Sequence, residues 1–370
     1  MKVLAFTPQY LPHLGGIEIL VDSLAQSLRH RLIEKIVVTD QPSQLAPRDV
    51  VNDTVVHRLN FTRAIQSRDT ASPLSVLHQL IEVYETEKPD LIHMHSATQA
   101  SAWYVARLFR KLSLKLPFIV TQHGVLESVD RLKVVRELLL KADALTAVSD
   151  AALQSALQFS NRTAFSTVIY NGIQKSGDAI RANQTGPRNK LLCVGRLQYE
   201  KGFDIAIAAL AKVRSAGFDA KLSIIGSGEY RGYLERVAFD YEVTDHVSFE
   251  GVLDHPSTQR AIANCSLVLV PSRTREGFSL VAAEAALCGI PCVASRVGGL
   301  SETVEDGVSG RLVAPDDPND FALAIVDLLG DDELWHALSE NARRRAEKKF
   351  DLNTCVERYT ILYRKLCGCS

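Results

Sequence analysis

The chain has 370 residues, of which 46% are hydrophobic and 23% charged, and its formal net charge is -1. That length accommodates two domains with separate cores, and the balanced charge argues against nucleic-acid binding, which needs a strongly basic surface. No apolar run approaches the roughly 20 residues of a membrane span, and no secretory signal is recognisable, so we expect a cytoplasmic protein. The seven cysteines are odd in number and lie mostly in apolar runs, as is typical of reduced core thiols.

The N-terminal half alternates apolar strands with amphipathic helices, the pattern of a doubly wound α/β domain. Strands are expected at residues 2–7, 36–39, 90–93, 118–121, 144–148 and 165–169, with helices after Gly16, across 74–86 and from residue 97. Gly15 and Gly16 open the first helix, where a glycine pair suits either a phosphate or a tight turn. Because the glycines do not form the G-x-G-x-x-G fingerprint, a nicotinamide cofactor is not indicated.

Histidines mark the ends of two of these strands. His93 and His95 lie at one strand end, and His123 with Gly124 follows another. Ligands of open α/β sheets gather at the carboxyl ends of the strands, although a lone histidine is more often structural. The H-x-H triplet invites a metal interpretation, but no further Cys/His cluster at ligand spacing supports it.

Residues 102–141 carry more positive than negative side chains, interleaved with Leu and Val. A basic amphipathic surface could lie on an anionic membrane, whereas the simpler interpretation is a solvated helix face. The polar stretch from Lys175 to Asn189, which contains Gly and Pro, is typical of a linker between domains.

The second half starts with a strand at residues 191–194 that leads into Gly195–Arg196 and Lys201–Gly202. A helix follows across residues 204–216. Two fixed cations at the head of such a strand–helix unit suit a diphosphate. Further strands are expected at residues 222–225 and 247–249, then a helix from residue 320 and a terminal amphipathic helix at 352–366.

The stretch from Ser266 to Ser295 is predicted to form strand, loop, helix and strand, and it contains two glutamates. Glu276 lies in the loop that leads to the helix N-terminus, where backbone N–H groups favour an anion. Glu284 lies inside an apolar helix, where a carboxylate is costly without hydrogen-bond donors. A nucleotide-sugar fits both, because its diphosphate takes the helix N-terminus while ribose and hexose diols each donate to a carboxylate. The alternative is that Glu276 caps the helix and Glu284 pairs with an arginine.

Taken together, these segments resemble the retaining GT-B glycosyltransferases of family 4. The matching motifs occur in family order over nearly the whole chain: PHLGGIE, TQHG at 121–124, VSD at 148–150, NGI at 171–173, VGRLQYEKG at 194–202, IGSGE at 225–229, EGFSLVAAE at 276–284 and VGGLSETVEDGVSG at 297–310. Ser301 replaces the proline usual in the last motif, and Ser279 stands where glycine is frequent. Neither change removes a functional group, so both bear on loop detail.

The resemblance implies an α/β protein of the GT-B fold, with two Rossmann-like doubly wound domains that face a cleft. Residues 1–175, with a C-terminal helix at 353–370 that crosses back, would form the acceptor domain, and residues 176–352 the nucleotide-sugar domain. It further implies that His123, Glu276, Arg196 and Lys201 are catalytic. The implied donor-binding residues are Gly15, Gly16, Arg196, Lys201, Gly226, Gly251, Val252, Glu276, Gly277, Phe278, Ser279, Leu280 and Glu284.

The implied reaction moves a hexose, with retention, from a nucleotide-sugar to a hydroxyl of a glycan, a glycolipid or a small molecule. UDP-sugars are favoured over GDP-mannose as donors. No cofactor or metal is expected, since the chain has no D-x-D triplet. Expected partners are the donor, a glycan or lipid-linked acceptor and the cytoplasmic surface of a membrane, but not nucleic acid. Two alternatives stay open, a nucleotide-sugar epimerase of the same fold and a non-catalytic nucleotide-sugar binding module.

Overall fold

The computed structural model describes residues 1–13, 15–41, 44–96, 98–126, 133–160, 165–174, 188–274 and 276–368. The chain folds into two compact units. The first, here called the N-terminal unit, comprises Met1–Gly172 and Leu352–Ser370. The second, the C-terminal unit, comprises Ile173–Asp351. Most of the expected linker, residues 175–187, lies outside the described residues.

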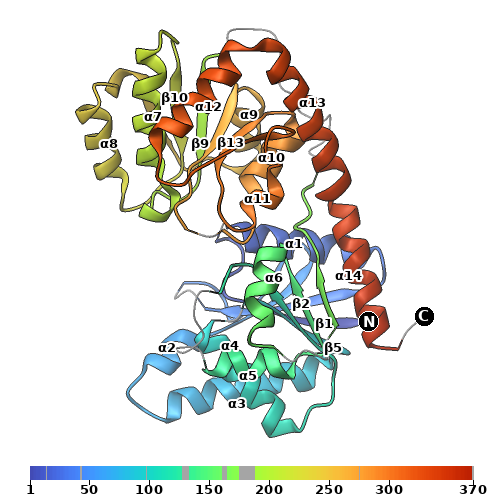
Figure 1. The fold of residues 1–370 in the computed structure, drawn as a ribbon. Helices are drawn as coiled ribbons and strands as arrows, with labels where there is room; N and C mark the ends of the chain where they lie inside the picture. The colour runs from blue at the N-terminus through green and yellow to red at the C-terminus, as the bar shows by residue number, and fades with distance from the viewer. Residues whose placement is uncertain are drawn as a thin grey trace. The chain divides into compact units, whose positions relative to one another are not determined.

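The N-terminal unit is built on a sheet of order β3-β4-β2-β1-β5-β6-β7-β8 (Figure 1). Its strands are β1 (Lys2–Thr7), β2 (Glu34–Asp40), β3 (Arg48–Val51), β4 (Thr54–Leu59), β5 (Leu91–His95), β6 (Phe118–Gln122), β7 (Ala144–Ala147) and β8 (Phe165–Val168). All neighbours are parallel except β3 and β4. The order reverses between β2 and β5, which flank β1, and such switch points are where ligands of α/β sheets bind.

The β3–β4 hairpin was not expected from the sequence. Asn52 and Asp53, which connect the two strands, have φ angles of 47° and 59°. Positive φ at both central residues is the hallmark of the hairpin turns whose twist matches that of the strands. Three of the four residues of β3 are exposed. The strand therefore lacks the apolar pattern by which strands are recognised in sequence.

Helices cover both faces of this sheet (Figure 1). One core contains side chains from α2 (Phe61–Gln66), α3 (Ala71–Glu87), α4 (Gln99–Leu112), α5 (Lys133–Lys141) and α6 (Asp150–Leu157). A separate core lies beneath α1 (Gly16–Arg29) and α14 (Leu352–Leu366). There Leu20 and Leu24 of α1 pack with Val356 and Tyr359 of α14. The expected return of the C-terminal helix to the first domain is therefore confirmed.

The C-terminal unit has a fully parallel sheet of order β11-β10-β9-β12-β13-β14. Its strands are β9 (Lys190–Val194), β10 (Lys221–Ile225), β11 (Val247–Gly251), β12 (Leu267–Val270), β13 (Cys292–Ser295) and β14 (Gly310–Val313). The connections run one way from β9 and the other way from β12. The switch point therefore lies between the carboxyl ends of these two strands.

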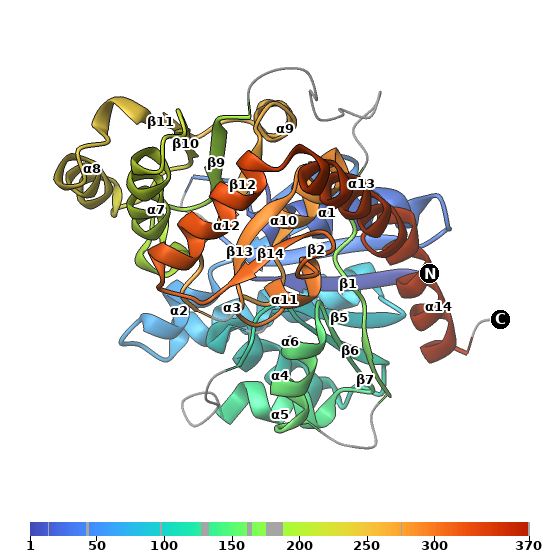
Figure 2. The ribbon, with the colours of Figure 1, turned by 45° about the horizontal axis from the view of Figure 1, so that its top comes forward.

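Two helical layers enclose this second sheet (Figure 2). α7 (Phe203–Ser215) contacts α8 (Arg231–Asp240) and α12 (Pro318–Gly330). α10 (Leu280–Cys288) contacts α9 (His255–Ala263), the short α11 (Leu300–Thr303) and α13 (Asp332–Lys349). Short 3₁₀ turns occur at η1 (Tyr199–Lys201) and η2 (Thr244–His246).

The basic stretch at 102–141 is occupied mainly by α4 and α5, and residues 127–132 lie outside the described residues. Leu138 and Leu139 are buried in the core rather than presented to a surface. Arg110 forms an ion pair with Glu137 at 2.7 Å, and Arg107 stacks on a tryptophan ring at 3.4 Å. Leu140 of α5 is 46% exposed, so the two helices place part of the stretch in the core and part at the surface.

Candidate functional site

In the C-terminal unit, two glycines let the loop after β9 approach the ends of its neighbouring strands, β10 and β12. Gly226 has a φ of 139°, and a Cβ there would collide with the carbonyl oxygen of Gly195. Gly202 has a φ of 64°, and a Cβ there would collide with the carbonyl oxygen of Pro271. Only glycine fits such close backbone approaches at positive φ. The contacts of Gly202 place Lys201, at the end of η1, beside the loop that follows β12.

Lys201 and Glu276 meet directly. Lys201 Nζ lies 2.6 Å from Glu276 Oε1, which also accepts a hydrogen bond from the Ser272 hydroxyl. The Glu276 side chain is 12% exposed and that of Lys201 31%. Among the residues with described coordinates, Glu276 Oε2 has no hydrogen-bond partner, and an ammonium group has three donors of which Glu276 uses one. One carboxylate oxygen and part of the ammonium group are therefore available to a ligand.

Arg273, which the sequence analysis did not single out, fixes these loops together. Its guanidinium group donates to both carboxylate oxygens of Asp204 at 2.8 and 2.7 Å, and to the carbonyl oxygen of Tyr199 at 2.9 Å. It also forms an ion pair with Asp316 at 2.6 Å and stacks on the Tyr199 ring at 4.3 Å. Hydrogen bonds to Asp204 raise the already high pKa of Arg273 further. The Lys201 turn is thus tied to the Glu276 loop from both sides.

Ser279, and not Glu276, caps helix α10. Its hydroxyl oxygen accepts from the Ala282 N–H at 3.3 Å. The alternative in which Glu276 is merely the helix cap is therefore wrong. Of the two residues between Glu276 and Ser279, Gly277 is buried, and Phe278 packs edge-on against Phe350 with ring centroids 5.3 Å apart. Leu280, the first helical residue, is half-buried.

Glu284 lies further along α10 with its side chain 13% exposed. Its nearest charged partner is His255, whose Nδ1 lies 3.8 Å from Oε1, instead of the arginine that the alternative required. Burial lowers the pKa of His255, so this ring is neutral near pH 7 and gives little compensation. Burial accordingly raises the pKa of Glu284 to about 7. A buried carboxylate in this state gains most from a ligand that donates hydrogen bonds to it.

Three other predicted donor contacts stand apart from this pair. The Arg196 side chain is exposed and, within the described ranges, makes no hydrogen bond or ion pair. Gly251, at the end of β11, has a φ of 71° with open space around its Cα, and Val252 beside it is 66% exposed. They leave unobstructed surface at the strand end.

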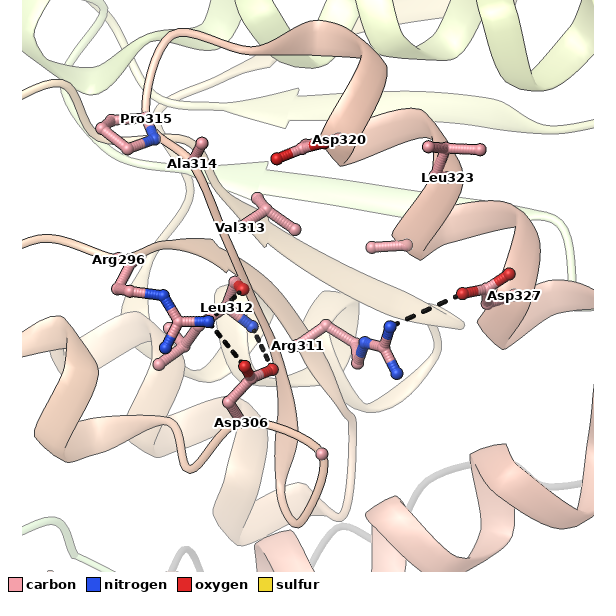
Figure 3. A pocket seen from close by; sticks show the side chains of 12 residues that line it. Arg296, Asp306, Arg311, Leu312, Val313, Ala314, Pro315, Asp320, Leu323 and Asp327 are labelled. Carbon is pink, nitrogen blue, oxygen red and sulfur yellow. Dashed lines mark hydrogen bonds and ion pairs between the residues drawn. The ribbon is translucent and has the colours of Figure 1, made fainter.

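A cavity of about 930 Å³ in the C-terminal unit lies between β14 and α12, and none of the predicted site residues lines it (Figure 3). Its charged groups compensate one another. Arg296 pairs with Asp306 at 2.6 Å, and Arg311 approaches Asp327 at 3.6 Å. We assign it no part in the site.

In the N-terminal unit, Gly15 precedes helix α1 and Gly16 is its exposed first residue. The carboxylate of Glu18 occupies the space that a Cβ on Gly15 would need, so the glycine permits this side chain to fold back over the helix start. Both glycines lie after β1, on one side of the switch point of this sheet.

A chain of hydrogen bonds inside the N-terminal unit links three polar side chains, those of Lys35 on β2, His95 on β5 and His123 after β6. Lys35 Nζ lies 3.0 Å from His95 Nε2, and His95 Nδ1 lies 3.2 Å from His123 Nε2. His93 contacts the Tyr363 hydroxyl and the Thr121 hydroxyl, both at 2.6 Å. All four ring nitrogens of His93 and His95 are therefore engaged. No cluster of three or more His, Cys, Asp or Glu side chains suited to a metal occurs in the described parts of the chain.

Lys35, His93 and His95 are buried, whereas His123 is partly exposed. Burial lowers the pKa of Lys35 to about 7. Burial, together with the charge of Lys35, lowers the pKa of His123 to about 3. His123 is therefore a neutral ring at physiological pH, and its Nδ1 has no partner among the residues that are described.

With this geometry in hand, similarity to known proteins identifies the class. Residues 14–176 match the family model described as Glycosyltransferase Family 4, and residues 178–345 match that of Glycosyl transferases group 1. An uncharacterized glycosyltransferase of Methanocaldococcus jannaschii is 31% identical over 99% of both chains. The chain belongs to the group 1 glycosyltransferases of family 4.

Solved structures identify the fold as GT-B. Sucrose-phosphate synthase of Thermosynechococcus elongatus superposes with a TM-score of 0.84 at 23% identity, covering all of both chains. HepE of Anabaena, solved in complex with UDP and glucose, gives a TM-score of 0.82 at 23% identity over 99% of this chain and 100% of the other. The expected fold class is confirmed. No helix in the described ranges is long and apolar enough to cross a membrane.

Proposed function

We propose that the protein transfers a hexose from a nucleotide-sugar, with retention of anomeric configuration and without a metal, to a hydroxyl of a glycan, glycolipid or small-molecule acceptor. The observation that carries this proposal is the Lys201–Glu276 pair at the switch point of the C-terminal unit, held with one carboxylate oxygen open. UDP-sugars are the first donors to test because UDP is the ligand of the structurally similar HepE. GDP-mannose is the second.

In this proposal, protein groups with fixed positions stabilise the charges that develop on the leaving group and on the sugar. The departing nucleoside diphosphate gains negative charge, which Lys201 and the N-terminus of α10 stabilise, and the exposed Arg196 adds a third positive group. The sugar becomes positively charged, and the open oxygen of Glu276 accepts from its hydroxyls. Glu284 accepts from the ribose diol. The proton of the acceptor hydroxyl passes to the leaving phosphate as the new glycosidic bond forms on the same face.

The proposal is tested by incubating the purified protein with UDP-glucose, UDP-N-acetylglucosamine, GDP-mannose and ADP-glucose in turn, and measuring release of the nucleoside diphosphate. Proton NMR of the transferred sugar then reports its anomeric configuration. We expect one donor class to be used and an α-linked donor to give an α-linked product. An altered sugar nucleotide formed without acceptor would instead identify an epimerase, and binding without turnover a binding module.

Metal independence is tested in the same assay by adding a chelator. Transfer should persist, because Lys201 and the N-terminus of α10 supply positive charge without an ion. Activity abolished by chelation and restored by a divalent cation would contradict this part of the proposal.

A further inference from the structure

Lys35 is the most unusual charged group of the N-terminal unit. It lies on β2 with only 3% of its surface exposed, and in the described portion of the chain it forms no ion pair with a carboxylate. The partner of its Nζ is the ring of His95, on β5, two strands away in the sheet. A buried lysine without an opposite charge destabilises the fold, so its presence calls for a functional explanation.

The hydrogen-bond chain from Lys35 has a direction that follows from elementary chemistry. Below pH 7 Lys35 is an ammonium group, which only donates, so His95 Nε2 must accept from it. A neutral imidazole has one N–H, which places the proton of His95 on Nδ1. That N–H points to His123 Nε2, which must accept, and the proton of His123 is consequently fixed on Nδ1.

His123 Nδ1 is the end of the chain that remains open. It has no hydrogen-bond partner in the described ranges, and its ring is the only one of the three that keeps partial exposure. The ring follows β6 at the carboxyl edge of the sheet, where ligands of this architecture bind. The free N–H can therefore donate to an oxygen atom, whereas the opposite tautomer would offer a lone pair there.

We propose that Lys35 and His95 are positioning residues that hold His123 neutral and in its Nδ1–H tautomer, so that it donates a hydrogen bond to an oxygen of the bound sugar. This inference rests on the proposed glycosyl transfer for the identity of the ligand. It assigns His123 the role of a fixed neutral donor and excludes it as the base that takes the acceptor proton.

The groups around the Lys35–His95–His123 hydrogen bonds support a fixed direction of donation from Lys35 to His123. His93 stacks on His95, with ring centroids 3.8 Å apart. His93 is itself hydrogen-bonded to Thr121 on β6 and Tyr363 on α14. Tyr359 and Cys355 of α14 are the other titratable groups at this core, and burial raises the pKa of Tyr359 above its usual range. Burial keeps His93, Tyr359 and Tyr363 in their neutral forms near pH 7, so none of these three groups competes with Lys35 for His95.

The direct test is the tautomer of His123 in the full-length protein labelled with ¹⁵N-histidine, read from long-range proton–nitrogen correlation spectra at pH 6. The wild type should show a protonated Nδ1 and an unprotonated Nε2. Lys35→Met, which keeps the chain length without the donor, should shift His123 toward a mixture of tautomers. Nε2–H in the wild type, or an unchanged His123 spectrum in Lys35→Met, would overturn the proposal.

Two further variants guard against a general structural effect. Tyr363→Phe removes a hydrogen bond from His93 in the same core without touching the Lys35–His95–His123 chain, so the His123 tautomer should be unchanged. His95→Asn places an amide donor near the position of Nδ1 while losing contact with Lys35, and should restore the Nδ1–H tautomer in part. If the His123 spectrum is unaltered in both His95→Asn and Lys35→Met, the hydrogen-bond chain does not set the tautomer of His123.

Kinetics then connect the tautomer to the reaction. In Lys35→Met we expect kcat to fall about tenfold, the scale of one lost neutral hydrogen bond, with a change in KM of less than about threefold. Tyr363→Phe should stay within about threefold of the wild type in both. If no donor supports transfer, the proposed function fails while the tautomer result stands. If transfer occurs and Lys35→Met reacts like the wild type, this inference alone fails.

Discussion

Lys201 and Arg273 in the C-terminal unit each meet carboxylates at 2.6–2.8 Å, whereas Lys35 in the N-terminal unit meets an uncharged histidine ring inside the core. In the first arrangement, a neighbouring carboxylate compensates the charge of each cation. The second leaves a cation that only hydrogen bonds stabilise, and its pKa falls to about 7 as a result. Removing a cation should therefore have opposite effects on stability in the two units, although activity should fall in both.

The largest effect is expected from breaking the paired arrangement at Arg273. Arg273→Ala leaves Asp204, whose side chain is 13% exposed, without its partner, and the free energy of unfolding should fall by roughly 3–5 kcal/mol. Denaturant unfolding measures this. Arg273→Lys, which keeps the charge but not the two parallel hydrogen bonds, should lie between the alanine variant and the wild type. A loss below about 1 kcal/mol in the alanine variant would show that Asp204 is compensated elsewhere.

The second prediction concerns the effect of Lys201 on catalytic activity. Lys201→Ala should lower kcat by on the order of 10²-fold, because a fixed positive charge is lost where the leaving group becomes negative. Steady-state kinetics with the best donor measure the effect. The matched control is Lys221→Ala, at the exposed start of β10, which should leave kcat unchanged. A change in KM alone would place Lys201 in ground-state binding rather than at the leaving group.

The third prediction concerns the buried Lys35 of the N-terminal unit, whose replacement should stabilise the protein. Burial lowers the pKa of Lys35 in the folded protein to about 7, from the ordinary 10.5 of a lysine, which corresponds to roughly 5 kcal/mol of lost stability. The hydrogen bond to His95 that Lys35→Met forfeits offsets about 1–3 kcal/mol of this. At pH 6 the variant should therefore be more stable by roughly 2–4 kcal/mol.

The pH dependence of that difference has a definite sign. Between pH 7 and 10.5 the unfolded chain binds more protons at Lys35 than the folded one, so wild-type stability rises with pH there. The advantage of Lys35→Met should shrink over this window in thermal unfolding experiments. The His123 tautomer should also become less uniform above pH 7, as Lys35 loses the proton that fixes the direction of the chain. A constant stability difference across the window would argue that Lys35 is not charged at low pH.

Glu284 gives the smallest expected effect. Burial raises its pKa in the folded protein to about 7, from the ordinary 4.5 of a glutamate, so the cost of its charge is absent below pH 4.5 and complete above pH 7. Because the side chain keeps some exposure, we expect the contribution of Glu284 to the stability of the ligand-free protein to fall by roughly 1–2 kcal/mol from pH 5 to pH 8, a loss that Glu284→Gln should not show. Glu250→Gln, at an exposed position, is the control. Weaker binding of nucleoside diphosphate by Glu284→Gln would support its contact with ribose.

Much of the fold could be predicted because parallel strands buried on both faces are continuous apolar runs, as at β12 and β13, and because Gly289 ends helix α10 between them. Glu276 and Glu284 could be singled out since each is a carboxylate in an apolar or anion-favouring setting. Ser279 as cap also follows from local sequence.

Contacts between distant strands could not be predicted in the same way. Arg273 lies in a loop whose letters do not reveal that Asp204 and Asp316 are its partners. Lys35 occupies an interior position of β2, and nothing near it in the sequence indicates that its ammonium group crosses the sheet toward His95. Both depend on the strand order, which places segments far apart in the chain side by side.

Helix α14 also determines when the N-terminal unit can finish folding during synthesis. The ribosome makes the whole C-terminal unit between Gly172 and Leu352, which takes on the order of ten seconds or more at about 5–20 residues per second. Throughout that interval Leu20 and Leu24 lack the cover of Val356 and Tyr359, and His93 lacks the hydroxyl of Tyr363. The nascent first half therefore carries an exposed apolar face and an unsatisfied core histidine, a state prone to aggregation until α14 emerges.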